Sequence, residues 1–370
     1  MDIIELIKAA IIGIIEGITE WLPISSTGHM ILADEFIQLN VSLQFWEVFL
    51  VVIQLGAIFA VLVLFFNKLN PFSPSKGKEG RKRTWVLWLK VVVGSIPAAI
   101  IGLLLDDWFT ENFHNAITVA IALVVYGIAF IVVERIKGRK TVQKKGRFST
   151  PSEGTNETEY APTRSLVEKE PSPSSYHRHP GRKNHRAVGK HSPEALEARA
   201  AHGEEVTCSA LQQTPPEALY KVKVKGGDVV TDVDQLGFVR ALAIGLFQCL
   251  AIVPGTSRSG ATILGGRILG VSREAAAEFS FFLAIPVMFG WSLLKVVKAF
   301  VLDDVVLTTT EWGVFVVGII VAFGVSILAI RFLMGYIRKH SFEVFGWYRI
   351  VLGIVVLAFF AFTGQLFIAQ

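Results

Sequence analysis

The chain is poor in cysteine and in charge. Among its 370 residues there are two cysteines, Cys208 and Cys249, and charged residues make up only 18% of the composition. Two cysteines exclude a disulfide framework and a cysteine-rich zinc site. Hydrophobic residues account for 52%, and the mean hydropathy is +0.51. The scarcity of charge therefore excludes an ordinary soluble domain and predicts an integral membrane protein.

Long runs without formal charge locate the membrane spans. A helix needs about 20 apolar residues to cross a hydrocarbon core of ~30 Å, and four stretches meet this condition. Two shorter stretches extend through flanks that a membrane interface tolerates. We therefore predict an all-α integral membrane protein with about six transmembrane helices. The four uncharged stretches are 48–67, 112–133, 312–330 and 350–370, and the two shorter ones are 91–105 and 279–294.

The loops between these spans alternate in charge. Segment 67–84 holds six basic residues and one acid, and segments 135–140 and 331–339 are also basic. Segments 106–115 and 303–311 contain acids but no Lys or Arg. Because basic loops stay on the cytoplasmic side, we place the first three inside and the other two outside. This bias explains the net charge of +5, so we predict no nucleic-acid partner.

Residues 141–235 differ from the rest of the chain. They are rich in Ser, Pro, Glu, Lys, Arg and His and show no sustained apolar periodicity. Such a segment cannot bury enough surface to offset its ordering entropy, so we predict a disordered cytoplasmic linker. Short ordered pieces near 193–202 and 219–230 are alternatives. Five of the eight histidines lie here, and metal sensing is the less favoured explanation.

The linker separates two similar halves. Residues 13–28 read GIIEGITEWLPISSTG and residues 245–260 read GLFQCLAIVPGTSRSG. Each begins with an apolar stretch, reaches a proline and ends in a Ser/Thr/Gly cluster. Each half has three predicted spans, and an odd number makes the halves run in opposite directions, as in inverted-topology repeats.

The segment before each proline is too short and too interrupted for an ordinary span. We interpret both as re-entrant helical hairpins, since non-helical backbone at membrane depth must be buried in protein or face water. The first hairpin would enter from outside and the second from inside, so that their turns meet near the middle. The predicted organisation is a first membrane repeat over 1–140, the linker over 141–235 and a second repeat over 236–370.

Glu16 and Glu20 are candidate cation ligands. They are four residues apart and share one helix face, where like charges repel. Two carboxylates kept together in a membrane imply a shared proton or a bound divalent cation, and oxygen ligands suit Mg²⁺ or Ca²⁺. The alternative is a helix end at which both glutamates are solvated, and this is the more common meaning of such a pair taken alone.

The cluster after the first proline suits an anion. Ser25, Ser26, Thr27 and Gly28 offer hydroxyl and backbone N–H groups at the start of a helix. A plain Ser/Thr helix cap is the alternative, and both can hold because they use the same geometry. His29 is a candidate general acid or base, although a histidine in a membrane helix is as often a packed hydrogen-bonding residue.

Arg258 is the most informative residue of the second cluster, where Ser257 and Ser259 flank it. An arginine among apolar segments is costly unless paired, and its planar fork suits phosphate. The alternative is an ion pair with the glutamates of the first half, and a phosphate between them would satisfy both. Arg349 precedes the last uncharged run. We favour a cytoplasmic-side anchor for it over a ligand deep in the bundle.

Two motifs resemble the signatures of a known family. The first runs from Glu16 to His29, and the second, PGTSRSGAT, runs from Pro254 to Thr262. Both are long, occur in the right order and closely resemble the signature motifs of the bacterial undecaprenyl-diphosphatase family, of the bacitracin-resistance type. The resemblance covers nearly all of the chain outside 141–235, which is usually a short loop in that family.

This resemblance implies a membrane enzyme that removes the terminal phosphate of undecaprenyl diphosphate and so returns the lipid carrier to peptidoglycan synthesis. It also implies a divalent cation, Mg²⁺ or Ca²⁺, a place in the bacterial plasma membrane and a site that faces the extracytoplasmic side. We predict Ser26 (the proposed nucleophile), His29, Glu20 and Arg258 as catalytic, Ser25, Thr27, Ser257, Arg258 and Ser259 as substrate-binding, and Glu16 and Glu20 as metal ligands.

The rival hypothesis is a transporter that flips a polyprenyl phosphate through the same pocket. A flippase needs only charge complementarity, whereas hydrolysis also needs a nucleophile and a proton shuttle, which Ser26 and His29 would supply. We therefore expect a phosphatase whose partners are a polyprenyl diphosphate lipid and the bilayer. A homo-oligomer stays open, as does the choice between Ser26 and water as the nucleophile.

Overall fold

The computed structural model describes residues 2–113, 115–146, 230–303 and 306–364. Within them the protein is helical, apart from one isolated β-bridge between Val230 and Val271. Six helical segments are long and apolar enough to cross a membrane, which confirms the all-α membrane class and the number of spans. The helices that contain them are α3 (Leu43–Leu64), α5 (Lys78–Phe113), α6 (Ala116–Gly146), α12 (Arg273–Val297), α13 (Thr309–Ile337) and α14 (Glu343–Thr363).

Several of these helices begin before the uncharged runs that predicted them, and polar residues cap some of them. α3 starts after Ser42, whose hydroxyl accepts from the backbone N–H of Phe45 at 3.1 Å. α13 starts after Thr308, which forms a capping box with Glu311. α14 begins at Glu343, well before residue 350. Its early start places Arg349 inside the span rather than in front of it.

Two pairs of shorter helices complete the unit: α1 (Ile3–Thr19) with α2 (Ser26–Phe36), and α10 (Phe238–Cys249) with α11 (Arg258–Ile268). α2, α10 and α11 have 11, 12 and 11 residues. At 1.5 Å per residue each is about 17–18 Å long, too short for a ~30 Å hydrocarbon core.

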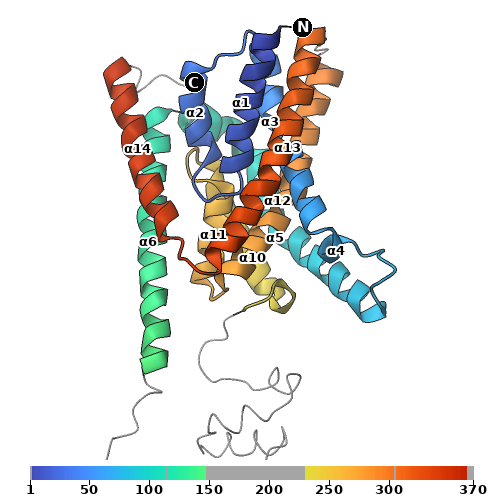
Figure 1. The fold of residues 1–370 in the computed structure, drawn as a ribbon, viewed down its shortest axis with the longest axis vertical. Coiled ribbons are helices and arrows are strands. Elements are labelled where there is room, and N and C mark those ends of the chain that lie inside the picture. Colours follow the sequence, from blue (N-terminus) through green and yellow to red (C-terminus); the bar gives the residue numbers. More distant parts are fainter. Residues whose placement is uncertain (1, 114, 147–229, 304–305, 365–370) are drawn as a thin grey trace, which may run out of the picture. The chain divides into compact units, whose positions relative to one another are not determined.

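Each pair forms a helical hairpin whose turn lies toward the middle of the bundle (Figure 1). We call residues 20–25 the first tip and residues 250–257 the second tip. A short α4 (Phe66–Leu69) precedes α5, and a 3-10 turn (Leu250–Ile252) opens the second tip. The re-entry of the hairpins from opposite membrane faces stays a prediction.

The helices of the two halves are interleaved. α1 packs along α13 and α10 packs along α5, so each hairpin lies against a helix of the other half (Figure 1). Small residues permit this approach. A Cβ on Gly245 of α10 would overlap the carbonyl of Gly94 in α5. In the α6–α14 contact, a Cβ on Gly127 or on Gly346 would lie 2.7 Å from the other residue's carbonyl oxygen.

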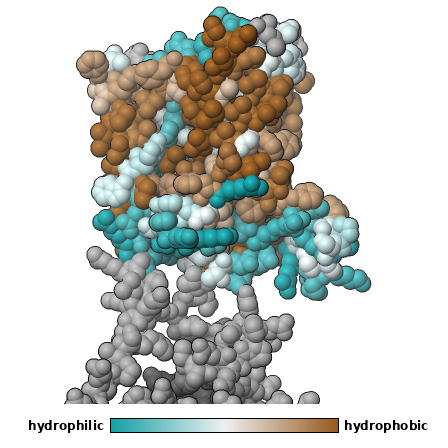
Figure 2. Space-filling view, in the orientation of Figure 1, coloured by the Kyte–Doolittle hydropathy of each residue, from teal (hydrophilic) through white to brown (hydrophobic). Residues whose placement is uncertain are grey.

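Large apolar side chains cover the outside of the bundle. Figure 2 shows a hydrophobic belt bounded by hydrophilic surface at each end. Leu104, Phe332 and Ile354, from three different spans, are 74%, 57% and 57% exposed. An apolar surface of this extent is unfavourable in water and is expected where a protein contacts lipid. The belt therefore agrees with a multi-pass membrane protein.

Near the basic loops, ion pairs connect the ends of neighbouring helices. Glu134 of α6 is buried and accepts from Arg267 at 2.7 Å and from Arg273 at 2.6 Å. Lys68 pairs with Asp232 at 3.4 Å. Burial alone would raise the pKa of Asp232, but the backbone N–H of Asp234 and the Lys68 ammonium together lower it.

Most of the predicted linker, 141–235, falls on residues 147–229, which lie outside the described residues. The five linker histidines and the proposed helix near 193–202 lie there too. At the edges, α6 continues to Gly146, past the predicted start of the linker. At the other edge, Val230 lies within the predicted linker but is bonded to the second half, because its carbonyl accepts from the backbone N–H of Ser272 at 2.8 Å.

Candidate active site

Both tips end in a serine with the same unusual backbone conformation. Ser25 (φ 76°) and Ser257 (φ 69°) are the non-glycine residues with positive φ in the described part of the chain. This conformation costs about 1–3 kcal/mol and persists only where surrounding contacts enforce it. Each hydroxyl caps the next helix: Ser25 accepts from the N–H of Gly28 at 3.4 Å, and Ser257 from that of Gly260 at 3.2 Å.

These matching turns place two helix N-termini at the tips, those of α2 and α11. The N-terminus of a helix carries free N–H groups and a partial positive charge, both of which suit a phosphate. The cap and the anion site that the sequence left as alternatives are therefore compatible here. The structure establishes the cap, and the anion site stays a prediction.

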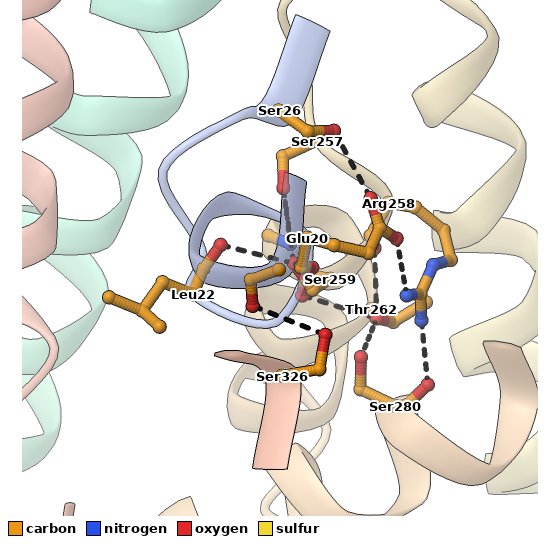
Figure 3. A network of polar contacts seen from close by, with 11 residues as sticks. Glu20, Leu22, Ser26, Ser257, Arg258, Ser259, Thr262, Ser280 and Ser326 are labelled. Atoms are coloured by element: carbon orange, nitrogen blue, oxygen red, sulfur yellow. Dashed lines mark hydrogen bonds and ion pairs between the residues drawn. The ribbon is translucent and has the colours of Figure 1, made fainter. Parts of the chain in front are cut away.

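A carboxylate of the first tip connects the two hairpins (Figure 3). Glu20 accepts from Arg258 Nη2 at 2.7 Å through Oε1 and from the Ser26 hydroxyl at 3.1 Å through Oε2. The ion pair is largely buried, with 8% and 11% of the two side chains exposed. The second Arg258 amine donates to the carbonyl of Ser280 in α12 at 2.9 Å. Glu20 is thus hydrogen-bonded both to a hydroxyl and to a phosphate-compatible guanidinium.

Neighbouring groups hold Arg258 in position. The Trp21 ring lies beneath the guanidinium, with the carbon 5.5 Å from the ring centroid, and its edge contacts Phe281. The Thr262 hydroxyl bonds the Arg258 carbonyl at 2.9 Å and the Ser280 hydroxyl at 2.6 Å. This support makes the guanidinium a fixed group rather than a mobile one.

Glu16 is the second carboxylate of the site. It is 2% exposed, and its Oε1 has no hydrogen-bond partner within the described residues. The backbone N–H of Glu20 donates to the Glu16 carbonyl at 3.0 Å, so the two glutamates lie one helical turn apart, as their spacing predicted. An unpartnered buried carboxylate oxygen beside a second carboxylate fits a hard cation. No cluster of three or more candidate ligands occurs in the described part of the chain, so substrate oxygens or water would complete the coordination.

The two tips also contact each other through backbone carbonyls. The Ser259 hydroxyl donates to the carbonyl of Glu20 at 3.1 Å, and it lies 3.2 Å from the Ser257 hydroxyl. Ser259 is 1% exposed. Its contacts connect the second tip to the first. Its predicted role toward the substrate stays untested.

Arg349 donates hydrogen bonds to both tips, and its interpretation as a cytoplasmic-side anchor is wrong. Its side chain is 0% exposed. It donates to the carbonyls of Thr256 at 2.7 Å and Gly255 at 2.9 Å in the second tip, and to that of Pro23 at 3.4 Å in the first. The Tyr126 ring lies 5.4 Å away. Arg349 became buried because α14 starts at Glu343 and carries it into the bundle.

His29 lies on α2, one turn after Ser26. Its Nδ1 is 2.7 Å from the carbonyl of Ser25, and its Nε2 is 2.7 Å from the Tyr348 hydroxyl. The imidazole stacks on the Tyr348 ring, with centroids 5.6 Å apart and an interplanar angle of 6°. The group that bonds the Ser26 hydroxyl is therefore Glu20, and His29 faces α14.

The structure brings the predicted residues together from both ends of the chain. Direct contacts connect Glu20, Ser26, Ser257, Arg258 and Ser259, while Glu16, Ser25, Thr27 and His29 lie on the same hairpin as Ser26. The structure adds residues that were not predicted from the sequence to have a site role. Trp21 and Thr262 lie within the two motifs, and Tyr126, Ser280, Tyr348 and Arg349 lie outside them. The one available sequence signal was the Tyr348-Arg349 pair, which interrupts an apolar stretch. The catalytic and binding roles of the predicted residues stay predictions.

The spans define the class of this protein, a multi-pass helical membrane protein, and the chemistry of the groups at the tips is compatible with a phosphate-bearing ligand. Comparison with known proteins narrows this class. The family model of the bacitracin resistance protein BacA matches residues 9–153 and 217–355. The chain belongs to this family. Both tips fall within the matched parts, and residues 154–216 separate the two matched parts.

Curated relatives match along nearly their whole length. A protein of Enterococcus faecalis, named undecaprenyl-diphosphatase, is 44% identical over 356 residues, which cover 96% of this chain and 98% of the relative. A Lactococcus lactis protein with the same name is 43% identical over 368 residues, 98% of this chain and 99% of the relative. Undecaprenyl-diphosphatase 1 of Clostridioides difficile is 44% identical over 359 residues, 97% of each chain.

Proposed function

We propose that this protein hydrolyses undecaprenyl diphosphate to undecaprenyl phosphate and inorganic phosphate, and so returns the lipid carrier to cell-wall synthesis. Relatives at 43–44% identity bear the name of this activity. The observation that carries the proposal is the contact chain from Ser26 through Glu20 to Arg258. It combines a nucleophile, a carboxylate that can accept its proton and a cation that can bind phosphate, as phosphoryl transfer requires.

In the proposed reaction Ser26 Oγ attacks the terminal phosphorus while Glu20 Oε2 accepts the hydroxyl proton. The bond from that phosphorus to the bridging oxygen breaks, and undecaprenyl phosphate leaves with the electron pair. Water then hydrolyses the phosphoseryl intermediate. The alternative, in which Ser26 orients a water that attacks directly, uses the same contact with Glu20. Isolation of phosphate bound to Ser26 supports the serine route.

Arg258 and the two helix N-termini stabilise the charge on the transferred phosphoryl group. The guanidinium needs little reorganisation, because Ser280 and Trp21 already fix its plane. Donors that are fixed before the reaction and shielded from water give the largest electrostatic contributions to catalysis. The paired glutamate keeps the buried guanidinium neutralised until the substrate phosphate reaches it.

Glu16 and Glu20 would hold a divalent cation, Mg²⁺ or Ca²⁺. The unpartnered Glu16 Oε1 supports this assignment. When bound, such an ion supplies positive charge to the diphosphate oxygens and lowers the repulsion between substrate and carboxylates.

We place the protein in the bacterial plasma membrane with its site open to the extracytoplasmic side. The α1–α2 hairpin, which carries Glu16 to His29, lies in the half of the bundle opposite α4 and the end of α6 (Figure 1). Those two elements carry basic segments, which favour the cytoplasmic side. The polyprenyl tail would lie against the apolar belt while the diphosphate occupies the site.

The test is phosphate release from a polyprenyl diphosphate by the full chain in detergent, with and without a chelator. Ser26→Ala and Arg258→Ala should each remove most of the activity without unfolding the protein. Matched controls are Ser95→Ala, a buried serine of α5 that bonds only its own helix, and Arg338→Ala, an exposed arginine. Absence of phosphate release by the unmodified protein would refute the proposal, and full activity of both site variants would refute the site.

A further inference from the structure

His29 has no free ring nitrogen. Nδ1 faces the carbonyl oxygen of Ser25, and Nε2 faces the hydroxyl of Tyr348, both at 2.7 Å. A carbonyl oxygen can only accept, so Nδ1 carries a proton. In the neutral imidazole Nε2 is therefore an acceptor, and the Tyr348 hydroxyl donates to it. The contacts of the ring fix its tautomer.

These contacts restrict how His29 can exchange a proton. Its only exchangeable position, Nε2, is covered by the Tyr348 hydroxyl. A hydroxyl can donate one hydrogen bond and accept another at the same time, which lets it pass a proton along. Tyr348 is 45% exposed, whereas Ser25 is fully buried, so of the two partners of the ring Tyr348 is the one through which a proton could leave.

The Ser26 proton has a different acceptor. The Ser26 hydroxyl bonds Glu20 Oε2, and no hydrogen bond joins the Ser26 and His29 side chains among the described residues. Within the proposed function, attack by serine therefore does not need the imidazole. The second step, in which water attacks phosphoserine, needs a base that Glu20 cannot provide once it has accepted the serine proton.

We propose that Tyr348 relays a proton from the attacking water to His29. The water oxygen forms a bond to phosphorus, and its proton moves to Tyr348 Oη as the tyrosine proton moves to His29 Nε2. The bond from phosphorus to Ser26 Oγ breaks, and Ser26 recovers its proton from Glu20. The imidazolium then returns its proton through Tyr348 to the departing phosphate, which restores both residues. This inference rests on the proposed function.

Tyr348→Phe tests the relay because it removes the hydroxyl and keeps the ring that stacks on His29. We expect kcat to fall about 10- to 100-fold, which reaches the lower end of the range for general acid–base catalysis, with KM changed less than about twofold. Tyr336→Phe is the matched control, because Tyr336 also stacks on a histidine, His340, with centroids 4.5 Å apart. An unchanged kcat for Tyr348→Phe, or a loss confined to KM, would overturn the relay.

A double-mutant cycle shows whether Tyr348 and His29 act in one proton transfer or contribute independently to catalysis. If Tyr348 and His29 act as one unit, the combination of His29→Gln with Tyr348→Phe is no slower than His29→Gln alone. Additive losses would contradict the relay. Measuring kcat across H₂O/D₂O mixtures requires no variant: two protons in motion give a curved dependence, whereas a straight line excludes the relay.

The relay and the proposed function fail in different ways. If the protein is not a phosphatase, the unmodified chain and Tyr336→Phe release no phosphate either. If only the relay is wrong, both are active and Tyr348→Phe is as fast as they are. Size-exclusion profiles and melting temperatures of all variants confirm that each compared protein is folded.

Discussion

Arg349→Lys should weaken the hydrogen bonds that hold the two tips together, while the positive charge at this position is kept. The arginine fork reaches two carbonyls of the second tip, at 2.7 and 2.9 Å, and one of the first tip at 3.4 Å. A lysine ammonium is a compact charge on a flexible stem and cannot span both tips in the same geometry. The variant therefore loses at least one charge-assisted hydrogen bond and leaves a buried carbonyl without a partner.

The size of the effect follows from those bonds. A hydrogen bond from a charged group contributes about 1.5–3 kcal/mol, and a stranded buried carbonyl costs about as much. If this loss affects the relative placement of the tips during catalysis, kcat/KM falls about 10- to 100-fold, since ~1.4 kcal/mol corresponds to tenfold. The loss should lie mainly in kcat, because Arg349 holds the tips and is not needed to bind the lipid.

The fall in kcat/KM is measured by phosphate release from a polyprenyl diphosphate in detergent, with Arg331→Lys as the control. Arg331 is an exposed arginine of α13, and lysine replaces it without changing the charge of the span. An interfacial anchor would tolerate lysine, because both side chains place a cation at the membrane surface. Equal kcat/KM for Arg349→Lys and the unmodified protein would therefore refute the bridging role derived from the contacts.

Three further predictions concern the cation, the packing and the surface charge. Removal of divalent cations by a chelator should abolish phosphate release, and Glu16→Gln should raise the Mg²⁺ concentration needed to restore it about 10-fold or more, whereas Glu47→Gln should not. Gly245→Ala should lower the melting temperature, because its Cβ overlaps the backbone of Gly94 and costs about 1–3 kcal/mol, whereas Gly335→Ala, with open space around it, should not. Asp232→Asn should cost less than about 1 kcal/mol at pH 7, since the pair with Lys68 is partly exposed. The lowered pKa of Asp232 means that its contribution is present above the unfolded pKa of about 3.9 and is lost as the pH falls through the folded pKa, so the melting temperatures of variant and parent should converge as the pH falls below that folded pKa.

The spans were predictable because charge is costly in lipid, so its absence marks a membrane segment. The prediction was less accurate at the helix ends, where capping by Ser42 and Thr308 extends a helix beyond its uncharged run. Arg349 shows the limit of this reasoning. Its position next to an apolar run favoured the membrane surface. In the structure, hydrogen bonds from the guanidinium to backbone carbonyls of both tips offset the cost of burying the charge.

The residues of the candidate site were recognisable from their chemistry, but their partners were not. Local spacing placed Glu16 beside Glu20, and the Ser/Thr/Gly cluster offered a helix cap as the alternative to an anion site. The ion pair of Glu20 with Arg258 joins residues 238 positions apart, and the contact of His29 with Tyr348 joins residues 319 positions apart. Such contacts depend on how the helices interleave, which no local pattern specifies.

The interleaved packing also has a consequence for biosynthesis. α1 leaves the ribosome early, yet the helix it packs against, α13, and the last link between the tips, Arg349 on α14, are made near the end. At ~5–20 residues per second, α1 waits roughly 15–60 s for its partner. For most of that time, until Arg258 is made, the carboxylate of Glu20 has no arginine to pair with. The nascent chain therefore cannot be active before its final helix is inserted, and any truncation that removes α14 should leave a protein that reaches the membrane but never forms a site.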